Sequence, residues 1–168
     1  MKVTLYMVSS MDGIVALGPD EDIHAYSSAE DRAFFLSRLK THDAVITGRM
    51  SARHKVSLPR FVLTKSPERY AQYADARTTY LCGSPAEILG AVEARGFKNI
   101  ALLGGPSTNT AFLKENLVDE FFLTIEPVLL GKGITLSGGN PLFVRWVLSG
   151  VRRLNEKGTL LLDYVRQR

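Results

Sequence analysis

The sequence has little cysteine and little histidine, and this scarcity excludes several classes of protein. Its one cysteine, Cys82, rules out an internal disulfide framework and fits a reducing compartment. The three histidines, His24, His42 and His54, have no metal-ligand spacing with each other or with Cys82, so we expect no metal site. A signal-peptide core, an apolar run long enough to span a bilayer, and the G-x-S-x-G and catalytic Cys/His signatures are all missing. We therefore predict a soluble cytoplasmic protein.

Positively charged residues are in only slight excess over negatively charged ones. Lys and Arg number 21 against 17 Asp and Glu, which gives a net charge of +4. The basic residues are scattered, with no basic arm and no interleaved aromatic residues. This distribution argues against nucleic acid and membrane surfaces as partners and is compatible with an anionic small molecule. Apolar residues make up 45% of the chain and charged residues 23%, as in globular proteins, and we expect residues 1–168 to form one domain.

Strand and helix patterns alternate through the first two-thirds of the chain, whereas the last third contains strand patterns alone. Helices are predicted over residues 29–40, after the N-cap and proline of Ser84-Pro85, and from Ser107. Strands are predicted over residues 3–9, 14–16, 43–47, 61–64, 78–82, 99–103 and 120–126, with a hairpin formed by 144–154 and 159–165. This order predicts an α/β fold whose central, mostly parallel sheet has helices on both faces and a C-terminal antiparallel hairpin.

The run Thr47-Gly48-Arg49-Met50-Ser51 directly follows a predicted buried strand. A glycine at a strand-to-helix turn lets backbone N–H groups approach an anion, and the N-terminus of the helix adds partial positive charge. Arg49 adds a guanidinium fork suited to phosphate. The simpler interpretation is an ordinary helix start with a solvated arginine, because turn chemistry alone explains the glycine.

A second polar turn, Leu63-Thr64-Lys65-Ser66, ends another predicted strand. Its hydroxyl, ammonium and hydroxyl groups in a row are suited to the 2′-phosphate of a ribose. The alternative is a capped, exposed turn in front of Pro67, which requires no ligand at all.

A third turn, Leu103-Gly104-Gly105-Pro106-Ser107-Thr108-Asn109, joins a predicted central strand to a helix. Two glycines followed by small polar residues at a helix start suit a pyrophosphate contact. The G-x-G-x-x-G pattern of a Rossmann site is absent, because the two glycines are adjacent. The alternative is a tight turn that needs glycine for a positive φ. Three anion-suited turns after three strands favour a shared binding site.

Four segments carry a family resemblance: residues 9–16 (Ser-Ser-Met-Asp-Gly-Ile-Val-Ala), residues 43–49 (Asp-Ala-Val-Ile-Thr-Gly-Arg), Gly104-Gly105-Pro106-Ser107, and a run from Phe112-Leu113 through residues 117–120 to residues 127–133 (Pro-Val-Leu-Leu-Gly-Lys-Gly). The last run, in this order and spacing, is the most specific. The chain resembles the dihydrofolate reductase superfamily from Met1 to about Arg166. Within it, the chain is most similar to the branch that contains the reductase domain of bifunctional riboflavin-biosynthesis deaminase-reductases.

This resemblance implies a three-layer, dihydrofolate-reductase-like fold with a mixed sheet of about eight strands, a homodimer, and NADPH as cofactor. By position, the resemblance implies that residues 48–51 contact the cofactor phosphates and that Thr64, Lys65 and Ser66 contact the adenosine end. It also implies that residues 104–108 contact the pyrophosphate and nicotinamide, and that Asp12 lies near the nicotinamide ribose. The cofactor-binding residues so implied are Asp12, Thr47, Gly48, Arg49, Met50, Ser51, Leu63, Thr64, Lys65, Ser66, Gly104, Gly105, Pro106, Ser107 and Thr108.

The same resemblance implies a small heterocyclic substrate, with or without a phosphate. Asp31 occupies the helix position of the pterin-binding acid of dihydrofolate reductases and is the candidate catalytic residue. Arg32, Arg53 and His54 are the candidates for a substrate phosphate. We therefore expect an NADPH-dependent oxidoreductase of the 5-amino-6-(5-phosphoribosylamino)uracil reductase type, which transfers a hydride to a ribosylaminopyrimidine.

Two departures from the riboflavin branch lie on the substrate side. Met50 and Ser51 stand where that branch has a Thr followed by an Asp-Asn-Pro-like motif, and Leu103 stands where it has a Glu before the glycine pair. Two alternatives therefore stay open: a dihydrofolate or other pteridine reductase, and an NADP-binding protein without turnover.

Overall fold

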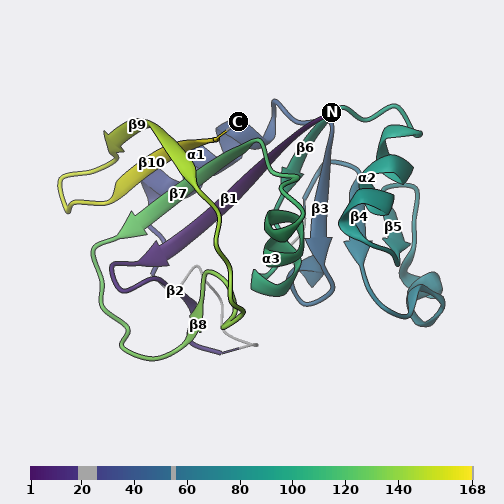
Figure 1. Cartoon of the computed structure of the whole chain (residues 1–168), viewed down its shortest axis with the longest axis horizontal. Coiled ribbons are helices and arrows are strands. Elements are labelled where there is room, and N and C mark those ends of the chain that lie inside the picture. Colours follow the sequence, from purple (N-terminus) through teal and green to yellow (C-terminus); the bar gives the residue numbers. More distant parts are fainter. Residues whose placement is uncertain (19–25, 54–55, 168) are drawn as a thin grey trace.

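The centre of the molecule is an eight-stranded sheet with the order β5-β4-β3-β6-β1-β7-β10-β9 (Figure 1). The computed structural model describes residues 1–18, 26–53 and 56–167. Six neighbouring strands, from β5 to β7, are parallel, and β10 is antiparallel to both β7 and β9. The strands are β1 (Lys2–Ser10), β3 (Ala44–Gly48), β4 (Arg60–Leu63), β5 (Thr78–Leu81), β6 (Asn99–Leu102), β7 (Glu120–Glu126), β9 (Trp146–Arg153) and β10 (Leu160–Arg166). The predicted mixed sheet with a C-terminal antiparallel hairpin is confirmed.

Helices cover both faces of this sheet, as predicted. Helices α2 (Pro85–Glu93) and α3 (Pro106–Lys114) lie on the face turned to the viewer in Figure 1, and α1 (Ala29–Leu39) lies behind it. The core under α2 and α3 is fully buried and includes Leu5, Ile46, Phe61, Ile88 and Phe112. A smaller apolar cluster of Leu39, Val45 and Ala101 lies on the α1 face. Apolar burial on both faces of the parallel strands explains their near-continuous hydrophobic sequences.

Two short elements were not predicted from the sequence. Strand β8 (Ile134–Thr135) emerges from the glycine-rich stretch and pairs with β2 (Ile14–Ala16) in a separate two-stranded sheet. The 3₁₀ helix η3 (Pro67–Tyr73) comes after the turn that ends β4. The helix expected after Gly48 is wrong as far as the described residues extend, because the chain there forms only a short 3₁₀ turn, η2 (Ser51–Arg53). Among the described helices, none has both the length and the apolar character needed to cross a membrane.

The strand order places the three predicted turns side by side. Strand β3 pairs with β4 on one side and with β6 on the other, and all three are parallel. Their carboxyl ends therefore share one edge of the sheet, at the bottom of Figure 1. The turns that start at Gly48, Leu63 and Leu103 leave this edge together. In open α/β sheets this is the edge at which ligands bind.

Candidate cofactor and substrate site

The carboxyl ends of β3 and β6 pack against each other at three glycines, which we call the glycine junction (Gly48, Gly104 and Gly105). A methyl group added at Gly104 would lie 2.6 Å from Cγ2 of Thr108 and 2.9 Å from the backbone nitrogen of Gly48. One added at Gly48 would lie 2.6 Å from Oγ1 of Thr108. The close approach of the Gly48 backbone therefore requires glycine at position 104, whereas a methyl group at position 48 would collide with the side chain of Thr108.

Gly105 is in a different environment from Gly48 and Gly104. A methyl group there would meet only Oγ of Ser51, at 3.3 Å, and its backbone angles of φ −56° and ψ 171° suit any residue. The alternative of a turn that needs positive φ is wrong, because none of the three junction glycines has one. Gly105 is also the N-cap of α3, whose first-turn N–H groups have no intrahelical acceptor. This turn offers the donors and partial positive charge that suit an anionic group.

A pocket of about 330 Å³, which we call the cationic pocket, lies beside the junction and joins the first and second predicted turns. It is lined by Arg49, Leu63, Thr64, Lys65, Ser66, Arg69 and Tyr70. Within the part of the chain that the structure describes, its three cations form no ion pair with an acidic side chain. The fold therefore concentrates uncompensated positive charge and two hydroxyl groups around one hollow, which is the chemistry that binds phosphate.

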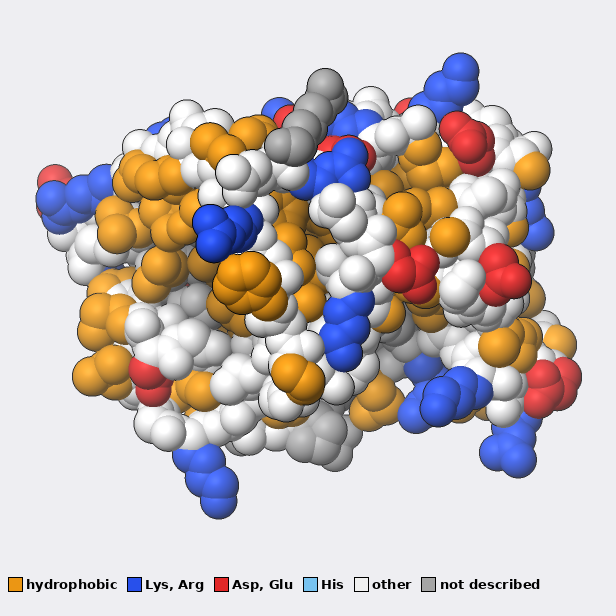
Figure 2. Space-filling view, viewed as in Figure 1, with side chains coloured by type: hydrophobic (Ala, Val, Ile, Leu, Met, Phe, Trp, Pro, Cys, Tyr) orange, Lys and Arg blue, Asp and Glu red, His pale blue; other side chains and the backbone are white. Residues whose placement is uncertain are grey.

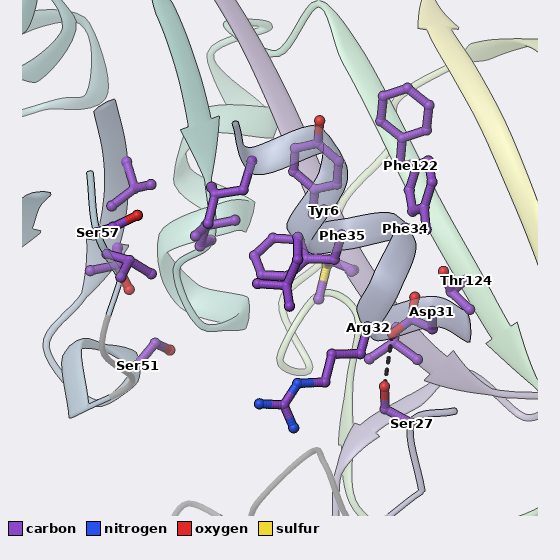
Figure 3. Close-up of a pocket in the computed structure, with 18 of the residues that line it drawn as sticks. Tyr6, Ser27, Asp31, Arg32, Phe34, Phe35, Ser51, Ser57, Phe122 and Thr124 are labelled. Carbon is purple, nitrogen blue, oxygen red and sulfur yellow. Dashed lines mark hydrogen bonds between the residues drawn. The ribbon is translucent and has the colours of Figure 1, made fainter. Parts of the chain in front are cut away.

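A larger cavity of about 440 Å³, the α1 cavity, separates α1 from the segment that comes after β3 (Figure 3). Its wall is mostly apolar and includes the rings of Tyr6, Phe34, Phe35 and Phe122. Tyr6 stacks on Phe122 with ring centroids 5.3 Å apart, and its hydroxyl group is 2.9 Å from Nε2 of the buried His42. The polar side chains of the wall are those of Ser27, Asp31, Arg32, Thr47, Ser51, Ser57, Arg60 and Thr124. A planar ring with a few polar substituents matches such a lining.

Asp31 supplies the carboxylate of the α1 cavity. Its Oδ2 accepts a hydrogen bond of 2.8 Å from the Ser27 hydroxyl group, drawn in Figure 3, and its backbone N–H donates to Oγ of Ser28, the N-cap of α1. Ser28 thus caps the first turn of α1, and the Asp31 carboxylate faces the cavity. Burial raises the pKa of the adjacent Tyr26 to about 12, and the charges of Glu126 and Asp31 act in the same direction.

A hydrogen-bonded network fixes the first turn of α1 to the sheet. The buried Glu126, at the end of β7, accepts bonds of 2.7 Å from the backbone N–H of Ser28 and from the hydroxyl group of Thr159. Asn155, in the turn between β9 and β10, bonds to Thr159 and to Glu30 of α1. The Asn155 bond is the main cause that lowers the pKa of Glu30. The position of Asp31 therefore depends on the β9–β10 turn and the end of β7 as well as on its own helix.

Asp12 has a role that its sequence position did not predict. Its carboxylate accepts hydrogen bonds from the Ser10 hydroxyl group at 2.5 Å and from the backbone N–H of Gly131 at 2.7 Å. These bonds lower its pKa. Asp12 therefore ties the β1–β2 turn to the segment after β7, and it lines neither the α1 cavity nor the cationic pocket.

The other predicted site residues fall into three groups. Arg32 extends from α1 into the space that separates the helix from Ser51 (Figure 3). Met50, Pro106 and Ser107 line neither pocket, and Met50 is exposed. Arg53 ends η2, and His54 lies outside the described residues. Within the residues that the structure does describe, no cluster of acidic, histidine and cysteine side chains is arranged to hold a metal ion.

One short segment connects all three parts of the site. Thr47 and Ser51 line the α1 cavity, Gly48 belongs to the glycine junction, and Arg49 lines the cationic pocket. Ser51 in addition lies against Gly105. The two pockets and the junction are therefore neighbours at the carboxyl ends of the strands.

Sequence reasoning missed several residues of this site. Tyr6 and Phe122 belong to strands that are adjacent in space and distant in sequence, so no local pattern joins them. Arg69 and Tyr70 lie on η3, directly after Pro67, and a proline at the first helical position was the available signal for that element.

Comparison with known proteins agrees with this fold. Residues 1–160 match the family model described as the RibD C-terminal domain. The uncharacterized protein YwjB of Bacillus subtilis is 31% identical to this chain, over 98% of each protein. A pyrimidine reductase-like protein from Corynebacterium diphtheriae has the same fold, with a TM-score of 0.83 at 19% identity over 99% of this chain and 92% of that one. RibD of Acinetobacter baumannii matches with a TM-score of 0.79 at 19% identity, over 99% of this chain and 58% of that longer one.

The match of the family model spans nearly the whole sheet, from β1 to the first residue of β10. It includes each turn that forms the cationic pocket, the glycine junction and the α1 cavity. The chain belongs to the RibD C-terminal domain family.

Proposed function

We propose that this protein is an NADPH-dependent reductase of the 5-amino-6-(5-phosphoribosylamino)uracil reductase type. The observation that carries the proposal is that one short segment, residues 47–51, connects a cationic pocket, a glycine junction and a ring-sized apolar cavity. An extended dinucleotide has the same order of parts, namely a phosphorylated adenosine, a pyrophosphate and a nicotinamide ring. Membership of the RibD C-terminal domain family supports the same reaction class.

The residues of the site fit NADPH in charge and in space. Arg49, Thr64, Lys65 and Ser66 would hold the 2′-phosphate, since they place cations and hydroxyl groups around one hollow. Gly105 leaves the surface above the glycine junction free of a side chain, and the first turn of α3 supplies N–H donors for the pyrophosphate. When bound, the reduced nicotinamide supplies a hydride.

In this proposal the α1 cavity receives the substrate next to the nicotinamide ring of the cofactor. Its aromatic wall orients a planar heterocycle, and its apolar lining excludes water from the reacting atoms. Asp31 recognises N–H groups of the heterocycle, or holds the proton that accompanies hydride addition to a C=N bond. Arg32 is the cavity cation that fits a phosphate on the substrate.

A spectrophotometric assay of NADPH oxidation tests this proposal directly. The riboflavin-type aminopyrimidine is the first substrate, and dihydrofolate and a second pterin are tested in parallel. Turnover of the aminopyrimidine alone supports the proposal, and turnover of a pterin alone replaces it by a pteridine reductase. NADPH binding without oxidation of any of the three would instead indicate a nucleotide-binding protein.

We also propose that the protein acts in the cytoplasm as a homodimer. Strand β9 is an edge of the large sheet and exposes about half of each of Val147, Leu148 and Val151. Apolar side chains gather on the left of Figure 2, where Figure 1 places this strand and β10. An apolar edge strand of this kind is a surface that natural proteins cover. Sedimentation analysis tests this point, and a monomer at every concentration would contradict it.

A further inference from the structure

Two residues that line the cationic pocket, Arg69 and Tyr70, have no role in the cofactor site as proposed above. The 3₁₀ helix η3 contributes Arg69, an exposed side chain, and Tyr70, a half-buried one, to the lining. Arg69 has no ion pair within the described part of the chain. Its backbone N–H donates to the carbonyl group of Ser66, so η3 is bonded to the turn that carries the predicted phosphate ligands.

The ring of Tyr70 contacts both the sheet and an arginine. One side of its ring stacks on Tyr80 of β5, with centroids 5.4 Å apart and planes inclined by 21°. The guanidinium carbon of Arg49 lies 5.8 Å from the centre of the same ring, within the range of a cation–π contact. Tyr80 is fixed in the sheet by its pairing with Val62 of β4, so Tyr70 has a rigid support.

We propose that η3 completes the phosphate site: Arg69 binds the cofactor's 2′-phosphate together with Arg49 and Lys65, and Tyr70 is a positioning residue that holds the Arg49 guanidinium over the pocket. This inference rests on the proposed function, since it assumes that the pocket receives the 2′-phosphate of NADPH.

The electrostatics favour this arrangement. A phosphate monoester carries nearly two negative charges at neutral pH. Three cations, Arg49 from one stretch of chain and Lys65 and Arg69 from another, line the pocket that would receive it. A free arginine side chain loses rotamer freedom when it binds, and the Tyr70 ring reduces that loss for Arg49 because it restricts the guanidinium before the ligand arrives. Arg69 and Tyr70 therefore determine preference for NADPH over NADH.

Calorimetric titration of the full chain with NADPH, NADH, 2′,5′-ADP and AMP tests the proposal, since the two members of each pair differ by the 2′-phosphate alone. Arg69→Ala should weaken NADPH and 2′,5′-ADP by about tenfold to a hundredfold and leave NADH and AMP unchanged. Arg77→Ala is the matched control, because this exposed arginine comes directly before β5, at the amino ends of the parallel strands and not at the carboxyl ends where the pocket lies. Melting temperatures without ligand show that each variant is folded.

The role of Tyr70 has its own test. Tyr70→Leu should weaken NADPH by about two- to fivefold, while Tyr70→Phe keeps the ring and should bind as the wild type does. In an Arg49→Ala background the effect of Tyr70→Leu should vanish, because the side chain that the ring positions is gone. Equal losses for the Leu and Phe variants, or an undiminished effect in that background, would overturn the positioning role.

The two proposals fail in different ways. If the wild-type protein binds neither NADPH nor 2′,5′-ADP, the proposed function and this inference are both wrong. If the wild type prefers NADPH and Arg69→Ala retains that preference, the proposed function stands and the assignment of Arg69 is wrong.

Discussion

Replacing Gly105 with alanine should remove cofactor binding and leave the protein folded. The backbone angles of Gly105 already suit alanine, and the new methyl group meets only the Ser51 hydroxyl oxygen, at 3.3 Å. That oxygen is the end of a short side chain that can rotate away. The same methyl group projects from the surface on which the proposed pyrophosphate lies. It should therefore block binding of the ligand and leave the fold intact.

The expected magnitudes separate these two effects. Alanine at an N-cap costs about 0.5–1 kcal/mol relative to glycine. The lower entropy of the unfolded chain offsets this by about 0.4–1 kcal/mol, because the native angles are compatible with alanine. The net change is within about 1 kcal/mol, or about 4 °C in melting temperature for a chain of this size. NADPH at a hundredfold excess over Kd adds about 2.7 kcal/mol to the wild type, which raises its melting temperature by about 5–11 °C.

The assay is thermal melting of wild type and variant with and without NADPH, and Gly104→Ala is the matched control. A methyl group at Gly104 would lie 2.9 Å from the backbone of Gly48, so this variant should lose about 1–3 kcal/mol of stability even without ligand. Gly105→Ala should melt near the wild type and show no NADPH shift. A full NADPH shift in the folded Gly105→Ala protein would refute our placement of the dinucleotide on the glycine junction.

The same geometry makes three further predictions. Arg49→Ala should weaken NADPH by about tenfold to a hundredfold and NADH little, and calorimetry with equal losses for both would contradict the 2′-phosphate assignment. Asp31→Asn should lower kcat/KM for the reduced heterocycle without changing NADPH affinity; an unchanged kcat/KM with about 1 kcal/mol of lost stability would leave Asp31 as a capping residue only. Burial, helped by Arg38 and Lys2, lowers the pKa of His42 below 6.5. The folded state therefore binds fewer protons than the unfolded chain, so stability falls as the pH drops below about 6.5. Denaturant midpoints measured against pH should lose this slope in His42→Gln, and an unchanged slope would contradict the reasoning.

Most of the fold is encoded in local sequence patterns. The strands of the sheet are mostly short β-branched runs, many of them followed by glycine or proline. Helix α2 starts at the predicted N-cap and proline of Ser84-Pro85, and the structure adds a capping box between Ser84 and Glu87. β8 was missed because it has two residues in a glycine-rich stretch, and only its pairing with β2 defines it. The helix predicted after Gly48 failed because the signal was the turn itself, which does not specify the conformation of the residues after it.

The candidate site was less accessible to sequence reasoning than the fold. The three turns could be found because each combines glycine or hydroxyl residues with a strand end, and the parallel sheet then brings them together. The reason for Gly104 could not be found, since a positive φ and a close backbone approach both select glycine in the sequence. The aromatic wall of the α1 cavity depends on the register between β1 and β7, which places Tyr6 beside Phe122 and which no local pattern encodes.

The hairpin turn between β9 and β10 helps to position the first turn of α1, which lines the α1 cavity. It does so through the hydrogen bonds that join Glu126, Ser28, Thr159, Asn155 and Glu30. A change in the length or sequence of that turn would alter the tilt of the first turn of α1, and with it the depth of the cavity, without touching any residue that lines it. Substrate range in such a protein can therefore diverge through a distant loop. For laboratory evolution, libraries directed at the 155–159 turn are an alternative to libraries directed at the cavity itself.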